Sequence, residues 1–505
     1  MSKNKQIIIF SLIGIAVLGA VTAALMLTAP KTEEEEEAPE VQAEEKPIVF
    51  ETDATVSKLT VSNENGEFVI TAEGEGYTIK EIEKAPLLTD NIASAAQNAA
   101  VMEADKLVEE VPEVGELAKY GLAEPRAVVS AEFSDGTVNT FKIGDDVPNT
   151  STKVYLTADD KTVYTYLKSK VSAYLGEKFD FVNKLAVPNY DQQTGEEVIK
   201  LTVERADLTE PLVIESIKSD DEDAIQVYSY RLKSPYDAYA DLKDAPNFMY
   251  SLFGLNAKSA QWVGMTEEDY ERAGLNNPSC KITVETTVKT YTLTLGLPVI
   301  NTVTDEEGDE KKELSGFFGM SSEVPDVLYL FSADDVPAST IDPEKLISRM
   351  FLMPYIYSLE TVEYSDSEGR SFTLGFETIE GEDKVDENGE TVKGEDIHYH
   401  YLNGEKTDEQ LLKNMYQYLI AAAGEELYLD EEKGELLATI AYNYVDKADG
   451  ENGKDIVRFY ESESDRKIII NLNGENLFKT RRMYITQLFA NADSYLRGGE
   501  VVLTY

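Results

Sequence analysis

The 505-residue sequence predicts an α+β protein in which an N-terminal transmembrane helix precedes tandem β-rich units, each with hairpins packed on one or two helices. Three observations lead to this prediction. A single long apolar segment lies near the N-terminus. Stretches that alternate between apolar and polar residues, separated by Asn-Gly and Asp-Gly turns, recur along the rest of the chain and indicate antiparallel strands. A short Gly-Leu-x-x-Pro element occurs at Gly121 and again at Gly274.

The apolar segment predicts a membrane anchor. Residues 7–29 carry no charge and, at 1.5 Å of helix per residue, are long enough to span a bilayer core of about 30 Å. Lys3 and Lys5 precede the segment and five glutamates at 33–37 follow it, so the positive-inside rule places the N-terminus in the cytoplasm. A cleaved signal peptide is the alternative, although its apolar core usually has only about 7–15 residues. We expect residues 1–30 to form the cytoplasmic tip and anchor of a single-pass cell-membrane protein, with the bulk of the chain extracytoplasmic.

The composition limits the classes of function. The formal net charge is −49, with 95 acidic and 46 basic residues spread along the chain. Such a surface repels nucleic acid and anionic lipid headgroups, so nucleic acid is not an expected partner. The chain has one cysteine, Cys280, which excludes an intramolecular disulfide. Residues 31–49 are acidic and contain proline, which predicts a self-repelling linker between the anchor and the folded part.

The repeated Gly-Leu-x-x-Pro element indicates duplicated domains. Each copy introduces an alternating stretch that ends on a glycine, Gly144 or Gly296, and the spacing between the copies is too long for a solenoid repeat. The predicted units are residues 53–178 and 180–345. A diverged third unit, which lacks the element, is expected at residues 350–505.

Within the first unit, the order of elements follows from composition and turn signals. Hairpins are expected at the Asn-Gly and Asp-Gly dipeptides, because these favour two-residue turns. Residues 86–108, rich in Ala, Met and Leu, predict the intervening helix, and residues 169–179 predict a short closing helix. In the second unit, the polar residues 301–316 interrupt the pattern and predict a loop.

The repeated element itself has a structural interpretation. Glycine permits a backbone turn that a Cβ would oppose, leucine can fill the core beside it, and proline holds the chain extended into the next strand. We therefore expect a structural joint between the helical connection and the next hairpin, with no ligand contact. Its residues are Tyr120, Gly121, Leu122 and Pro125 in the first copy and Gly274, Leu275 and Pro278 in the second.

The ordered set of features resembles a bacterial family known only as domain of unknown function 4340. The resemblance rests on the single N-terminal anchor, the β-rich start with its following helix, the element from Tyr120 to Pro125, and the glycine-ended strand at residues 141–144. It implies a membrane-anchored protein of repeated α+β domains, often encoded beside components of ABC-type transporters. An accessory role at the outer face of such a transporter follows as an expectation. The family has no agreed catalytic residues, so the resemblance assigns none here.

Few residues of the chain point to chemistry. His398 and His400, the only histidines, lie two apart in a predicted strand and so on one face, which makes them weak candidates for a metal site. The sequence contains no H-E-x-x-H, G-x-S-x-G, P-loop or C-x-x-C motif. We therefore predict no catalytic residue and no cofactor. Four tyrosines are expected to cover the sheet of the second unit, with a sugar- or peptide-binding patch as the alternative: Tyr228, Tyr230, Tyr236 and Tyr239.

Taken together, these features favour a membrane-anchored extracytoplasmic protein that binds or scaffolds. Its expected partners are the membrane, through residues 7–29, and the membrane subunits of an ABC-type transporter. Catalysis is the less expected role. The alternative is a cell-envelope hydrolase that acts on glycan or peptide through carboxylates, since 95 acidic residues leave such a pairing open.

Overall fold

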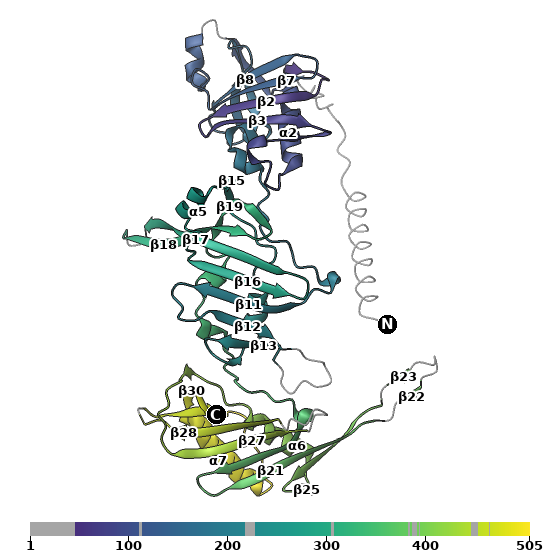
Figure 1. The fold of residues 1–505 in the computed structure, drawn as a ribbon, viewed down its shortest axis with the longest axis vertical. Coiled ribbons are helices and arrows are strands. Elements are labelled where there is room, and N and C mark those ends of the chain that lie inside the picture. Colours follow the sequence, from purple (N-terminus) through teal and green to yellow (C-terminus); the bar gives the residue numbers. More distant parts are fainter. Residues whose placement is uncertain are drawn as a thin grey trace, which may run out of the picture.

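The computed structural model describes residues 46–505 apart from 111–113, 218–227, 305–307, 382–383, 386–390, 393, 446–452 and 464. The predicted anchor at residues 7–29, and the predicted linker as far as residue 45, lie outside the described residues. Three large antiparallel sheets follow one another along the chain and stand in a row (Figure 1). We call the parts of the chain that hold these sheets units 1, 2 and 3.

Unit 1 is built on an eight-stranded sheet. Its strands alternate between buried and exposed side chains, as in β2, where Val56, Leu59 and Val61 are buried. The hydroxyl of Tyr174 on α3 donates to the carbonyl of Ala95 on α2 at 2.5 Å, which ties together the two helices of the unit. The strands are β2 (Val56–Asn63), β3 (Gly66–Glu73), β4 (Gly76–Thr78), β6 (Lys106–Glu110), β7 (Ala127–Phe133), β8 (Val138–Asp146), β9 (Lys153–Thr157) and β10 (Thr162–Leu167), and the helices are α2 (Thr89–Ala100) and α3 (Lys168–Leu175). A separate two-stranded sheet pairs β1 (Ile48–Glu51) with β5 (Val101–Glu103).

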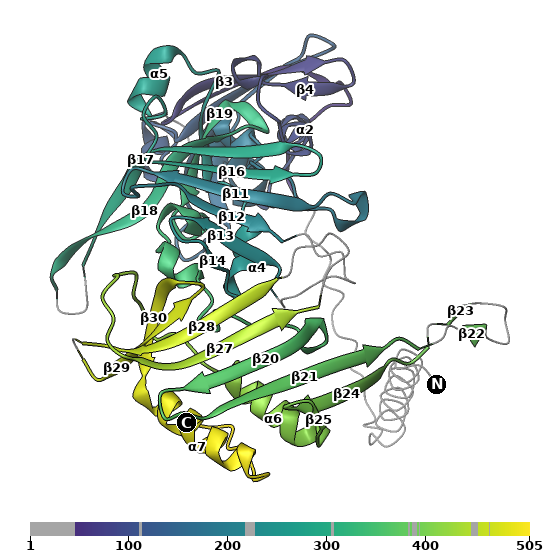
Figure 2. The same cartoon turned by 60° about the horizontal axis from the view of Figure 1, so that its bottom comes forward.

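Unit 2 is built on a nine-stranded sheet with two short helices, α4 (Asp244–Met249) and α5 (Glu267–Arg272). The hairpin of β17 and β18 projects beyond the rest of this sheet (Figure 2). The strands are β11 (Val198–Arg205), β12 (Leu212–Ser216), β13 (Tyr230–Ser234), β14 (Ala238–Tyr239), β15 (Ser259–Val263), β16 (Cys280–Thr286), β17 (Thr290–Thr304), β18 (Glu310–Ser321) and β19 (Val324–Ser332).

Unit 3 is also built on a nine-stranded sheet, with helices α6 (Glu409–Leu419) and α7 (Arg482–Leu496) packed together. The rings of Tyr418 on α6 and Tyr484 on α7 stack with their centroids 5.3 Å apart, and both side chains are fully buried. The strands are β20 (Leu359–Asp366), β21 (Ser371–Ile379), β24 (Ile397–Leu402), β25 (Glu405–Lys406), β26 (Glu426–Leu427), β27 (Leu436–Tyr444), β28 (Lys454–Glu461), β29 (Lys467–Leu472) and β30 (Glu475–Arg481), and a small ribbon pairs β22 (Lys384–Val385) with β23 (Thr391–Val392).

The three sheets place their strands in the same spatial order. The first strand of each unit lies in the middle, with the second and third strands to one side of it. The last four strands lie to the other side in chain order, and the strand that follows the helical connection closes the far edge. The orders are β4-β3-β2-β7-β8-β9-β10-β6, β14-β13-β12-β11-β16-β17-β18-β19-β15 and β25-β24-β21-β20-β27-β28-β29-β30-β26, so units 2 and 3 add one short edge strand. Each sheet falls inside one of the intervals 53–178, 180–345 and 350–505, whose limits stay a prediction.

The predicted α+β fold class is wrong, and the transmembrane helix that belonged to this prediction lies outside the described residues. Strand predominates over helix in the described residues, and the three units are antiparallel β structures with short helices. Among these described residues, none of the helices has both the length and the apolar character needed to cross a membrane.

The overestimate of helix has a local cause. The sequence predicts one helix over residues 86–108, whereas α2 ends at Ala100 and the chain continues into β5 and β6. Val101 and Val108 are β-branched, which disfavours helix, and alternation buries Met102 while Val101 stays 51% exposed. The predicted loop at 301–316 is likewise mostly strand, because β17 extends to Thr304 and β18 begins at Glu310.

Candidate functional site

The first Gly-Leu-x-x-Pro element ends a short helix in unit 1. The 3₁₀-helix η2 (Val114–Tyr120) stops at Gly121, whose φ is +69°. The amide of Gly121 donates to the carbonyl of Ala118 at 3.1 Å, and the amide of Leu122 donates to the carbonyl of Leu117 at 3.1 Å. These two bonds, three and five residues back along the chain, are those of a Schellman C-cap with glycine in the left-handed region.

The second element ends helix α5 of unit 2 in the same way. Gly274 has a φ of +75°. Its amide donates to the carbonyl of Glu271 at 3.0 Å, and the amide of Leu275 donates to the carbonyl of Tyr270 at 2.9 Å. The two joints therefore share one backbone arrangement, and a residue other than glycine at either position would be strained.

A second pair of glycines holds each joint against its sheet. A Cβ on Gly144 of β8 would lie closer than 3.0 Å to the carbonyl oxygen of Tyr120. A Cβ on Gly296 of β17 would lie equally close to the carbonyl oxygen of Ala273. The residue before the cap glycine therefore packs its carbonyl directly on a strand that has no side chain at that point.

The remaining joint residues pack or direct the chain. The side chain of Leu122 is fully buried, and that of Leu275 is 8% exposed. Pro125 and Pro278 each lie two residues before a strand begins, β7 in unit 1 and β16 in unit 2. The proline ring fixes φ and keeps the preceding residue extended, which suits this entry into the sheet.

The joint of unit 1 carries a small apolar cluster that is separate from the main core. Tyr120 packs in it with Leu122 and Val163, and its ring lies 4.8 Å from that of Tyr155 at an angle of 60°. Burial, with a hydrogen bond to Glu109, raises the pKa of Tyr120, which is only 8% exposed. An aromatic ring thus fills the space between the joint and strands β9 and β10.

The joint of unit 2 also carries a small apolar cluster, which contains Leu275 and Leu328, but a pocket of about 220 Å³ opens beside Ala273. Trp262, the only tryptophan of the chain, forms one wall on β15 and is 47% exposed. Its ring lies 6.2 Å from that of Phe179 in η3 (Lys178–Phe181), so the pocket adjoins the contact between units 1 and 2. The pocket is lined by Gln261, Trp262, Met265, Asp269, Arg272, Ala273, Phe318 and Leu328.

Charged groups surround the mouth of this pocket on α5. The carboxylate of Asp269 accepts hydrogen bonds from the amide and hydroxyl of Thr266 at 2.9 and 2.7 Å, and these bonds hold the pKa of Asp269 below its usual value. The guanidinium of Arg272 bonds Glu268 at 3.0 Å. An apolar pocket with a few polar groups at its rim is the usual form of a binding site for a small molecule or a side chain.

Within the described part of the chain, the lining of neither this pocket nor a second one contains the carboxylate pair that the hydrolase alternative requires. A second pocket of about 230 Å³ lies between α4 and the 3₁₀-helix η6 (Pro343–Leu346). Asp244 is its one carboxylate, as Asp269 is in the first pocket. Hydrolysis of glycans through carboxylates uses two of them, about 5–10 Å apart.

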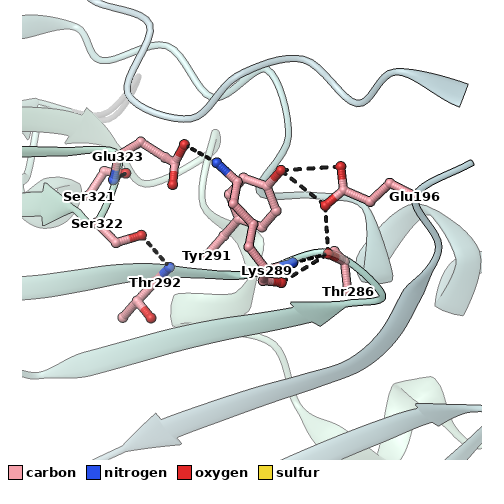
Figure 3. Close-up of polar contacts among 8 residues, drawn as sticks. All are labelled: Glu196, Thr286, Lys289, Tyr291, Thr292, Ser321, Ser322 and Glu323. Carbon is pink, nitrogen blue, oxygen red and sulfur yellow. Dashed lines mark hydrogen bonds and ion pairs between the residues drawn. The ribbon is translucent and has the colours of Figure 1, made fainter. Parts of the chain in front are cut away.

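A polar network at the turn between β16 and β17 is self-contained (Figure 3). Glu196 accepts from the hydroxyl of Thr286 at 2.5 Å and from that of Tyr291 at 3.1 Å. Lys289 pairs with Glu323 at 2.6 Å and lies over the ring of Tyr291. Since these groups bind one another, the network fastens the segment before β11 to this hairpin and serves structure.

The two histidines, the weak candidates for a metal site, both lie on β24 of unit 3. The ring of His398 stacks on Tyr357 at 4.0 Å, and its Nδ1 shares a hydrogen bond with the hydroxyl of Thr378 at 2.9 Å. His400 is 7% exposed, and burial lowers its pKa. Within the described ranges, no group of three or more His, Cys, Asp or Glu side chains is placed to hold a metal ion.

The tyrosines that the sequence places on unit 2 are mainly structural. The rings of Tyr228 and Tyr239 stack at 4.6 Å, and the hydroxyl of Tyr228 lies 3.1 Å from that of Ser348. Tyr228 is 4% exposed, which leaves little of it for a ligand. Cys280 is also buried, and burial raises the pKa of its thiol to about 12, so it is no nucleophile.

Sequence reasoning missed the pocket of unit 2. The signal available was the difference between the two copies of the joint, where Tyr120 precedes the first glycine and Ala273 precedes the second. The other signal for the pocket was Trp262, the one tryptophan of the chain, in a segment of mixed apolar and polar residues.

The fold and its pocket define a class of protein, an array of antiparallel β units with an open apolar pocket. Residues 78–278 match the model of a family described as a domain of unknown function (DUF4340), and this part of the chain belongs to that family, as the resemblance predicts. The match extends from the end of β4 to Pro278 and so contains both glycine joints. Neither curated proteins nor solved structures gave a match to the chain.

Proposed function

We propose that the chain is a membrane-anchored extracytoplasmic binding or scaffold protein whose partners are membrane subunits of an ABC-type transporter. The observation that supports this most is the pocket beside Trp262. A half-exposed tryptophan at the edge of an apolar pocket presents a large rigid surface to a partner at little cost in side-chain entropy. The row of three similar sheets gives such a site a long support.

The anchoring part of the proposal rests on the sequence. Residues 7–29 are apolar and long enough for a bilayer, two lysines precede them, and the acidic residues 31–49 would hold the folded units away from the membrane surface. The transporter as partner follows from the family resemblance, whose members are often encoded beside transporter components.

Protease accessibility tests the topology. Protease added to intact cells stripped of their wall should digest the chain beyond residue 50, while a cytoplasmic marker protein stays whole. Protection of the C-terminal part under conditions in which another exposed surface protein is cleaved would contradict the proposal.

Co-purification tests the binding role. The full chain, solubilised with its membrane in mild detergent, should carry transporter membrane subunits through purification, and Trp262→Ala should reduce their yield. Val138→Ala is the matched control, because Val138 is an apolar side chain of unit 1 that is 57% exposed and lies outside the pocket. Equal yields from parent and Trp262→Ala would remove the pocket from the proposed function.

A further inference from the structure

The pocket of unit 2 lies where unit 1 holds the ring of Tyr120. Tyr120 and Ala273 occupy the same place in the two joints, since each directly precedes the cap glycine. The carbonyl of each also packs on the glycine of the neighbouring strand, Gly144 or Gly296. The two units therefore differ at this point by one whole phenol ring.

The base on which the ring of Tyr120 rests has a counterpart in unit 2. Tyr155 lies one residue before the β9 partner of Ile143, the residue that precedes Gly144. Phe318 lies one residue before the β18 partner of Leu295, the corresponding residue of β17. The sheet register thus places Tyr155 and Phe318 at equivalent positions, and Phe318 lines the pocket.

The floor and the wall of the site also correspond. Val163 of the first cluster pairs with Glu109 on β6, and Leu328 of the pocket pairs with Trp262 on β15. Glu109, which bonds the hydroxyl of Tyr120 in unit 1, is therefore replaced by the indole of Trp262 in unit 2. Unit 2 keeps an aromatic base and an apolar floor and gains an aromatic wall. The ring of Tyr270 packs in its joint cluster but does not line the pocket, which stays open beside Ala273.

We infer that the pocket of unit 2 takes up an aromatic side chain from a cationic segment of a partner protein. The inference rests on the binding function proposed above and names what is bound. Unit 1 shows the arrangement, with the ring of Tyr120 tilted by 60° against that of Tyr155, a geometry that aromatic pairs prefer. In unit 2, Phe318 offers the same face to a ring that comes from outside.

The charge around the pocket sets the charge of the partner. Helix α5 at its mouth carries four acidic residues and one arginine, in a chain whose net charge is −49. A segment with lysine or arginine beside its aromatic residue gains from this field, and an acidic segment is repelled.

The intrinsic fluorescence of Trp262 reports on this pocket alone, because the chain has no other tryptophan. The probe is tyramine, a phenol that carries an ammonium group, titrated into the full chain held in lipid nanodiscs. We expect a saturable change in the Trp262 signal. 4-Hydroxyphenylacetate, with the same ring and a negative charge, should bind several-fold more weakly, and hexylamine, with the charge but no ring, should give no saturable change. Equal responses to tyramine and hexylamine would overturn the aromatic assignment.

Two variants connect the response to the pocket. Ala273→Tyr adds to unit 2 the ring that Tyr120 provides in unit 1. The new ring should fill the pocket and abolish the tyramine response. Phe318→Leu keeps the pocket apolar but removes its aromatic base, and should weaken tyramine binding about three- to tenfold, the range expected for one aromatic pair. Val288→Tyr is the control, because it adds the same ring at a site of unit 2 that is 68% exposed and outside the pocket.

The folding of each variant is checked through Cys280, which is 2% exposed in unit 2 and should stay protected from iodoacetamide. If Cys280 of the Ala273→Tyr variant stays protected from iodoacetamide and the variant still responds to tyramine like the parent, the inference is wrong. If Ala273→Tyr exposes Cys280, Phe318→Leu decides, and unchanged tyramine affinity there also overturns the inference. The full chain could also carry no transporter subunit through purification and still show a Trp262 response that is selective for the aromatic probe. That result would count against the scaffold function but not against the pocket assignment.

Discussion

Replacing Gly296 by alanine should loosen unit 2 through one backbone contact. The new Cβ would lie closer than 3.0 Å to the carbonyl oxygen of Ala273, a distance that real Cβ atoms essentially never show. The obstacle is backbone and not the end of a flexible side chain, so the joint itself has to move away from β17. The same carbonyl accepts a hydrogen bond from the amide of Leu297 at 2.8 Å, and that bond would be lost with the movement.

The two losses set the magnitude for Gly296→Ala. Forcing one extra methyl group into a packed site costs about 1–3 kcal/mol. The broken hydrogen bond adds about 1 kcal/mol. We therefore expect a loss of about 2–4 kcal/mol in the free energy of opening of unit 2. Gly76→Ala in β4 is the matched control, because no heavy atom lies within 4 Å of its added Cβ and its φ is not positive; it should change stability by no more than about 0.5 kcal/mol.

Amide hydrogen exchange of the full chain measures this loss, since it reports on each unit separately. A loss of about 2 kcal/mol accelerates exchange of the β16 and β17 amides by about 30-fold where exchange follows the opening equilibrium. The amides of unit 3 should keep their parental rates. If Gly296→Ala exchanges within twofold of the parent in β17, the contact between joint and strand does not support unit 2, and the structural account of the joint is wrong.

Other outcomes follow from the titrating and reactive side chains. Burial lowers the pKa of His400 below the ordinary 6.5, so that, as pH falls, the unfolded chain binds a proton before the folded chain does. Unit 3 should therefore lose stability as pH falls below about 6.5. In denaturant unfolding, His400→Gln should remove this contribution to the pH dependence of stability. The thiol of Cys280, with its pKa raised to about 12, should resist iodoacetamide at pH 8 in the folded chain and react once unit 2 opens, faster in Gly296→Ala than in the parent. Micromolar Zn²⁺ should leave the melting temperature unchanged, because His398 is engaged with Tyr357 and His400 is buried; a rise that His398→Ala abolishes would show a metal site.

The joints could be predicted from the sequence because their chemistry is local. A glycine that ends a helix, a leucine beside it and a proline before the next strand each act through their own backbone geometry. The glycine-ended strands at Gly144 and Gly296 were also visible as a pattern. That these glycines touch the joints was not visible, since the contact joins residues that are more than twenty positions apart.

The errors in the fold arose where tertiary pairing overrides local preference. Residues 101–110 follow an alanine-rich helix and contain good helix formers, yet β6 is held by pairing with β10 across the unit. Polar residues near 301–316 suggest a loop, but the two arms of the β17–β18 hairpin satisfy each other's backbone groups although their side chains there are mostly exposed. In the first case the partner strand is distant in the sequence, and in the second case the partner strand is polar.

The pocket could not be predicted from the repeat because a repeat is recognised by what its copies share. The Gly-Leu-x-x-Pro pattern passes over the preceding residue, tyrosine in one unit and alanine in the other. Only the sheet register shows that Phe318 and Trp262 surround the space that Ala273 leaves open.

The three units differ at the one connection where binding would be decided. Their strand order is common, so the sheets by themselves cannot distinguish one unit from another. In unit 1 the connection before the fourth-last strand is a helix closed by the ring of Tyr120, and in unit 2 it is a helix that leaves a pocket. In unit 3, residues 428–435, all of them described, make this connection without a helix. A partner that recognises an aromatic-sized pocket beside such a joint is therefore expected to bind unit 2, and substitutions in the joint of unit 1 should affect stability without affecting partner binding.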